Sequence, residues 1–198
     1  MNEHDQRLVR GARARRRIAR HAVDIASVEG LTGLSLGRLA TDLGLSKSGI
    51  QTLFKTKENL QLAAADAAQA EFTEAVLVPA QEAPDGTARL RALIERWIAY
   101  AETPLFAGGC FWSATLPDFD SRPGPVRDVL LAQHEAWLAH LAARLRHAAD
   151  AGEIPALDPD LRAFQLDAVL VAANTAMRWG DPTAAAKVWR IVDQLLGD

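Results

Sequence analysis

The basic side chains that could bind a polyanion are concentrated in the first sixty residues. This stretch holds 11 lysine and arginine residues against 6 aspartate and glutamate residues, which gives a formal net charge of +5. The rest of the chain holds 11 and 19 and carries a net charge of −8. A basic segment joined to an acidic one predicts an anionic partner for the basic segment, although a solvated arginine-rich tail would have the same composition.

Residue types that serve catalysis or metal binding show no matching arrangement. The sequence has no Ser–His–Asp pattern, no phosphate-binding glycine loop and no cluster of metal ligands, so we expect no catalytic residue, metal, cofactor or enzymatic activity. His140 and His147 share a helix face, but two histidines favour surface or packing roles. The one cysteine, Cys110, has no basic residue within ten positions. This favours a buried apolar thiol over a redox-active one.

The elements that carry these residues are predicted to be helices. Alanine and leucine far outnumber valine, isoleucine and threonine, and no segment alternates like a strand. We expect an all-α fold of about nine helices, with one domain over residues 1–60 and another over 61–198. The first helix should run from about residue 10 to Glu29, and a long helix from Lys57 to Val78. Residues 117–125 should form a loop.

Residues 35–55 have the pattern of a helix-turn-helix. Ser35 and Ser46 are suitable N-caps for two short helices, and Gly44 between them tolerates the positive φ that the turn requires. Ala40 is small enough for two steeply crossing helices to touch. The apolar residues that would fill the wedge between the helices are Leu39, Leu43, Leu45, Ile50 and Leu53.

This segment resembles the DNA-binding domain of the tetracycline-repressor (TetR) family of bacterial transcription regulators. The similarity covers about residues 10–62 and rests on Gly30, Ser35, Leu39-Ala40, Gly44-Leu45-Ser46, Lys47, Gly49-Ile50, Phe54 and Lys57-Glu58-x-Leu60. It implies an N-terminal three-helix DNA-binding domain and a C-terminal helical domain for effector binding and dimerisation. Gln51 and Leu53 stand where the family usually has aromatic residues that touch the DNA backbone.

The resemblance and the geometry of a recognition helix imply a set of DNA contacts. Ser48, Gln51 and Thr52 are the candidates for base edges, while Lys47 suits either a base or a phosphate. Gln51 suits a bidentate contact with adenine or, in the place of the family aromatic, a phosphate. The complete set of expected DNA-contacting residues is Arg13, Arg16, Arg17, Ser35, Arg38, Ser46, Lys47, Ser48, Gln51, Thr52, Lys55, Thr56 and Lys57.

Aromatic residues gather in the C-terminal domain, where the family binds its effectors. They predict a site for a small apolar or aromatic molecule, although core packing would also explain each of them. The expected pocket residues are Trp97, Tyr100, Phe106, Cys110, Phe111, Trp112, His134, Trp137, Asn174 and Met177.

The last two helices are apolar over more than one stripe, which predicts association. The expected interface residues are Phe164, Val171, Val188, Val192 and Leu195, and the resemblance implies a homodimer. We therefore expect a ligand-responsive regulator, a repressor released from a palindromic operator, in the bacterial cytoplasm at the nucleoid and without a membrane partner. The alternative is a regulator without a ligand, whose C-terminal domain serves dimerisation or a protein partner.

Overall fold

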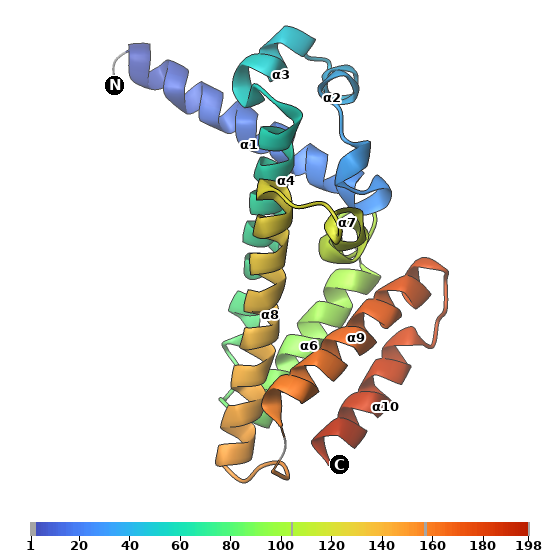
Figure 1. Ribbon diagram of the computed structural model, residues 1–198. Helices are drawn as coiled ribbons and strands as arrows, with labels where there is room; N and C mark the ends of the chain where they lie inside the picture. The colour runs from blue at the N-terminus through green and yellow to red at the C-terminus, as the bar shows by residue number, and fades with distance from the viewer. Residues whose placement is uncertain (1–2, 104, 157, 198) are drawn as a thin grey trace. The chain divides into compact units, whose positions relative to one another are not determined.

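The computed structural model describes residues 3–103, 105–156 and 158–197, and every regular element in these ranges is helical (Figure 1). The predicted all-α fold class is therefore confirmed. None of the helices in the described ranges is long and apolar enough to cross a membrane. In chain order the elements are α1 (Glu3–Glu29), η1 (Leu31–Gly33), α2 (Leu36–Leu43), α3 (Lys47–Phe54), α4 (Lys57–Phe72), η2 (Thr73–Leu77), α5 (Val78–Ala80), α6 (Thr87–Glu102), α7 (Phe111–Phe119), α8 (Pro125–Asp150), α9 (Pro159–Arg178) and α10 (Ala184–Leu196).

The chain divides into two compact units that are not contiguous in sequence. The first unit comprises residues 1–70 and 106–130, and the second comprises residues 71–105 and 131–198. This division differs from the linear boundary after residue 60, because α7 packs against α1 and η1 and so belongs with the N-terminal helices.

The first unit is built around the C-terminal half of α1. Its buried face begins at Ile18 and continues through Ala22, Val23 and Ala26, all of which are fully buried. These side chains recur at the three- and four-residue spacing of one helix face. Leu39 of α2 and Ile50 of α3 are equally buried, so they complete this small core.

Local signals in the sequence set the ends of the helix-turn-helix. The Ser35 Oγ accepts a hydrogen bond from the Arg38 backbone at 3.0 Å, and the Ser46 Oγ accepts one from Gly49 at 3.1 Å. Gly44 ends α2 in the left-handed region, with φ 63° and ψ 32°. Both predicted caps and the predicted turn glycine are confirmed.

The second unit packs its helices pairwise. Helix α6 buries Leu90, Leu93, Ile94 and Trp97, and it packs against α9. Helix α9 also packs against α10. The Asp158 side chain caps α9 by accepting hydrogen bonds from two backbone amides of its first turn.

Three boundaries differ from the prediction. Helix α1 begins at Glu3, about seven residues earlier than predicted. The run predicted over 57–78 contains a π-helical segment, η2, before α5 ends it at Ala80. Helix α7 continues through Pro117 to Phe119, where a loop was expected. A proline so close to the end of a helix removes one backbone hydrogen bond, which such a short element tolerates.

Candidate nucleic-acid interface

Helix α3 divides sharply into a buried and an exposed face. Ile50 and Phe54 are buried in the core of the first unit. On the opposite side, Lys47, Ser48, Gln51 and Thr52 are all exposed. The spacing of these four residues follows one side of a helix, so their side chains form a continuous polar surface.

Two polar groups on this surface remain available to a partner. The Thr52 Oγ1 donates to the Ser48 carbonyl at 2.9 Å, and the Ser46 Oγ caps the helix, so the hydroxyl groups are used locally. Within the described residues, the side chains of Lys47 and Gln51 have no hydrogen-bond partner. An ammonium group and an amide offering both donor and acceptor therefore face solvent side by side.

Arg15 holds the C-terminal end of α3, a role that the sequence analysis missed. Its Nη1 donates to the Leu53 carbonyl at 2.7 Å, and its guanidinium lies 4.6 Å from the centre of the Phe54 ring. A cation at a helix C-terminus satisfies a carbonyl and opposes the helix dipole. The spacing along α1 could have predicted this contact. Arg15 lies three residues before Ile18 and seven before Ala22, so it shares the helix face that packs on the core.

The other arginines of α1 face solvent. Arg13, Arg16 and Arg17 are exposed, and they precede Ile18, which is fully buried. Figure 1 shows this blue N-terminal part of α1 extending away from α2 and α3. The predicted contacts of these arginines with DNA remain predictions.

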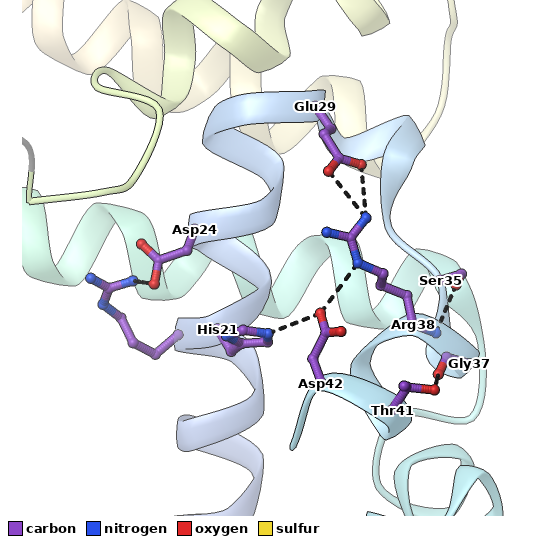
Figure 2. A network of polar contacts seen from close by, with 9 residues as sticks. His21, Asp24, Glu29, Ser35, Gly37, Arg38, Thr41 and Asp42 are labelled. Atoms are coloured by element: carbon purple, nitrogen blue, oxygen red, sulfur yellow. Dashed lines mark hydrogen bonds and ion pairs between the residues drawn. The ribbon is translucent and has the colours of Figure 1, made fainter. Parts of the chain in front are cut away.

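Arg38 takes part in a polar network that joins α1 to α2 (Figure 2). Its Nη1 lies 3.1 Å from the Glu29 carboxylate, and its Nε donates to the Asp42 Oδ2 at 3.2 Å. The same Asp42 oxygen is 3.2 Å from the His21 Nε2. The hydrogen bond with His21, followed by that with Arg38, lowers the pKa of Asp42. Arg38 thus holds α2 on α1, and a DNA contact from it would compete with these ion pairs.

The connection between α3 and α4 is short and strained. Lys55 has φ 65° and ψ −55°, and the Thr56 amide donates to the Phe54 carbonyl at 2.8 Å. This is a γ-turn with positive φ, which is costly for a residue with a side chain. The turn leaves the Lys55 side chain exposed, next to the N-terminus of α4.

Thr56 and Lys57, also predicted to contact DNA, have partners within the first unit. The Thr56 Oγ1 accepts a hydrogen bond from the Asn59 amide at 3.1 Å. The Lys57 Nζ donates to the Thr32 carbonyl at 2.6 Å. Of the residues Lys55, Thr56 and Lys57, only Lys55 therefore offers an uncommitted charge in the described part of the chain.

Aromatic and polar side chains of the second unit form a cluster. The Phe72 ring meets the Tyr100 ring at 5.2 Å and the Trp137 ring at 5.5 Å, and Trp97 lies 6.3 Å from Tyr100. Each pair is edge-to-face, which is a favoured aromatic geometry. These four residues, together with the two polar ones described next, are called the aromatic cluster.

A carboxylate completes the aromatic cluster. Asp167 accepts hydrogen bonds from the His134 Nε2 at 2.9 Å and from the Trp137 Nε1 at 3.0 Å. The hydrogen bond to Asp167 raises the pKa of His134, more than burial lowers it. His134 and Trp137 were predicted from the sequence, whereas Phe72 and Asp167 were not, because their roles depend on contacts between distant helices.

The predicted effector residues do not all fall in one unit. Trp97, Tyr100, His134 and Trp137 belong to the aromatic cluster, while Asn174 and Met177 lie elsewhere in the second unit, on α9. The remaining four belong to the first unit, where the Phe106 and Phe111 rings lie 6.5 Å apart and those of Phe111 and Trp112 lie 5.5 Å apart. Cys110, the fourth, is buried, as expected of an apolar thiol.

Helix α9 carries an exposed apolar stripe. Phe164 is 64% exposed and Val171 is 41% exposed, and Leu161 and Trp179 continue the same side of the helix. Val188 and Val192 of α10, also predicted at an interface, are buried within the chain, at 1% and 0% exposed. That prediction was wrong for these two residues, because they form the face of α10 that packs on the rest of the second unit. Leu195 is half-buried.

Comparisons with known proteins place this fold. A family model described as the tetracyclin repressor-like C-terminal domain matches residues 86–192. A TetR transcriptional regulator from Chloroflexus aurantiacus is 25% identical, with a TM-score of 0.83 and coverage of 95% of this chain and 94% of that chain. A TetR-family regulator from Streptomyces coelicolor is 21% identical, with a TM-score of 0.80 and coverage of 95% of both chains. No curated protein sequence matches significantly.

A third solved structure is AibR in complex with isovaleryl coenzyme A and operator DNA. It is 22% identical, with a TM-score of 0.75 and coverage of 92% of this chain and 98% of that chain. The fold and the exposed face of α3 define an all-helical protein with an N-terminal helix-turn-helix. With the family model matching more than half of its residues, the chain belongs to the TetR family of transcriptional regulators.

Proposed function

We propose that this protein represses transcription by binding a palindromic operator through α3. The observation that carries the proposal is the exposed polar face of α3, on which Lys47 and Gln51 have no partner in the described residues. A helix-turn-helix places the N-terminal half of its second helix in the major groove, where such side chains meet base edges.

The charges around α3 support the rest of the contact. Lys55 is exposed in the turn that follows the helix, and Arg13, Arg16 and Arg17 are exposed on α1. These cations would bind phosphates, which position the protein on the duplex without reading its sequence. Arg38 and Lys57 act instead inside the first unit, where they hold neighbouring elements in place.

A homodimer would supply the second recognition helix that a palindrome requires. The exposed stripe of α9, with Phe164 and Val171 at its centre, is an apolar surface whose exposure to water is unfavourable. An isologous contact between two copies of this stripe would bury it and relate the two α3 helices by a two-fold axis.

The aromatic cluster is the proposed site of effector recognition. Its rings offer apolar and π surface, while Asp167 and His134 offer a carboxylate and a titratable imidazole. The structural likeness to AibR, which was solved with isovaleryl coenzyme A and operator DNA, supports an effector that acts on DNA binding. We infer a small apolar or aromatic effector that releases the operator.

The test is footprinting of the protein on the region upstream of its own gene, followed by titration with small apolar and aromatic compounds. A protected palindrome that one of the compounds releases would support repression controlled by an effector. A protected palindrome that no compound releases would favour a regulator without a ligand. If the folded protein protects no sequence, the proposal fails.

A further inference from the structure

Hydrogen bonds join the turn η1 to two helices, α4 and α7. From α4, the Lys57 Nζ donates to the Thr32 carbonyl at 2.6 Å, and the buried Gln61 Nε2 donates to the Leu31 carbonyl at 2.8 Å. From α7, the Asp118 Oδ2 accepts from the Thr32 amide at 3.3 Å and from the Thr32 Oγ1 at 3.0 Å. Thr32 therefore lies directly between α7 and the first turn of α4.

The carboxylate of Asp118 lies in space that the absence of a side chain at Gly30 leaves open. Gly30 has φ 73°, a conformation that side chains disfavour, and a Cβ added there would overlap the Asp118 carboxylate. A glycine at this position thus serves both the backbone turn and the close approach of α7.

Helix α7 is joined to α1 at further points. The Gly108 amide donates to the Ser27 Oγ at 2.8 Å, and the Ala107 amide donates to the Asp24 Oδ1 at 3.2 Å. Together with the contact of Asp118 with Thr32, these bonds fix both ends of the segment 107–118 on the last turns of α1 and on η1.

Helix α4, which contacts η1, is joined to α3 by a short connection, so a movement of η1 would also move the end of α3. Lys57 is the first residue of α4, and only Lys55 and Thr56 separate it from the last residue of α3. The γ-turn at Lys55 leaves little slack in this connection. Moving Thr32 would therefore move the start of α4, and with it the end of α3 that Arg15 holds from the other side.

We propose that Asp118 is a positioning residue for DNA recognition, acting through Thr32 and Lys57 to hold α3 in its DNA-binding orientation. The inference rests on the proposed function.

The test compares Asp118→Ala, Asp118→Asn and Asp120→Ala in the full chain. Alanine removes the acceptor for both Thr32 donors, whereas asparagine keeps an acceptor oxygen. Asp120 is exposed, two residues further on, so its variant controls for the lost charge. Fluorescence anisotropy with the protein's selected operator duplex and with a scrambled duplex gives the specific and non-specific affinities.

We expect Asp118→Ala to lower the affinity for the operator by at least about fivefold, the lower end of typical coupling between two sites. The affinity for the scrambled duplex should stay unchanged, because the phosphate-binding cations are still present. Asp118→Asn and Asp120→Ala should both bind like the wild type. An equal loss on both duplexes would mean a general loss of structure and would overturn the proposal, as would an unchanged operator affinity.

Hydrogen exchange of the protein without DNA gives a second, independent readout. Asp118→Ala should speed exchange of the Asn59 and Leu60 amides in the first turn of α4, while Asp120→Ala should not. If Asp118→Ala does not fold, Thr32→Val removes one of the two donors and should give the same pattern at smaller amplitude. Unchanged exchange at α4 contradicts the inference, whereas a wild type that binds no DNA contradicts only the proposed function.

Discussion

Gln51 is the side chain most suited to reading a base. It lies on the exposed face of α3, and within the described residues its amide has no partner. A bidentate contact between an amide and adenine is worth about 1–3 kcal/mol of discrimination against the wrong base. Gln51→Ala should therefore abolish the preference at one symmetric pair of operator positions and leave non-specific binding intact.

Binding-site selection with the Gln51→Ala variant measures this effect, and Lys55→Ala is the matched control. Lys55 offers a point charge in the turn after α3, so its removal should weaken binding to all sequences alike. The salt dependence should then fall by about one unit per subunit. An unchanged sequence preference for Gln51→Ala, with uniformly lower affinity, would assign Gln51 to a phosphate.

His134 is expected to titrate above its usual pKa. Its hydrogen bond to Asp167 favours the protonated imidazole in the folded protein. The contact therefore stabilises the fold fully below the pKa of the unfolded state, and this contribution is lost as the pH rises through the raised pKa. The stability lost in His134→Gln should accordingly be larger at pH 6 than at pH 8.

Titration of the histidine ring protons by NMR measures the pKa directly. The His134 midpoint should lie above its usual value of about 6.5 and should fall in Asp167→Asn. His140 serves as the control in the same spectrum, because burial, followed by Arg144 and Arg89, lowers its pKa. A His134 midpoint that does not respond to Asp167→Asn would rule out the assigned hydrogen bond.

At the scale of elements, two glycines of the helix-turn-helix should respond to alanine in opposite directions. Neither would meet another atom within 4 Å after a Cβ is added. Gly44 has φ 63°, so Gly44→Ala should destabilise the protein by about 1–2 kcal/mol. Gly37 lies inside α2, so Gly37→Ala should stabilise it by about 0.5–1 kcal/mol.

Chemical denaturation followed by circular dichroism checks both values. Because a Cβ has open space at both positions, the difference in the free energy of unfolding between the two variants reports the backbone conformation alone. Equal effects of the two substitutions would contradict the left-handed geometry assigned to Gly44.

The elements that the sequence predicted well are those with local signals. Ser35 and Ser46 cap helices through neighbouring backbone amides, so their effect is visible in a few adjacent residues. The all-α class follows likewise from composition and from the spacing of apolar residues.

The features that the sequence did not predict depend on contacts between distant residues. The packing of α7 on α1 and the hydrogen bond of Thr32 to Asp118 join segments far apart in the chain. The apolar pattern of α10 identifies a buried face, but it does not say whether the same chain or a second copy covers it. Val188 and Val192 were therefore assigned to the wrong contact.

At the scale of the whole molecule, the stripe of α9 predicts a dimer. Phe164→Glu combined with Val171→Glu places two charges in the exposed apolar surface, so the variant should sediment as a monomer. Ala186→Glu combined with Gln194→Glu adds the same charge at exposed positions of α10 and should leave the dimer intact. A stripe variant that stays dimeric in analytical ultracentrifugation would move the interface elsewhere.

Binding-site selection with the wild-type chain from a random duplex library tests whether the protein reads an operator through α3. A dimer that reads DNA through the exposed face of α3 should enrich a palindrome whose half-sites lie about one helical turn apart, or slightly more. Its affinity should fall steeply between low and physiological salt, because exposed lysine and arginine residues release counterions from the phosphates. A folded dimeric protein that enriches no sequence, or whose binding ignores salt, would contradict operator recognition by the exposed face of α3.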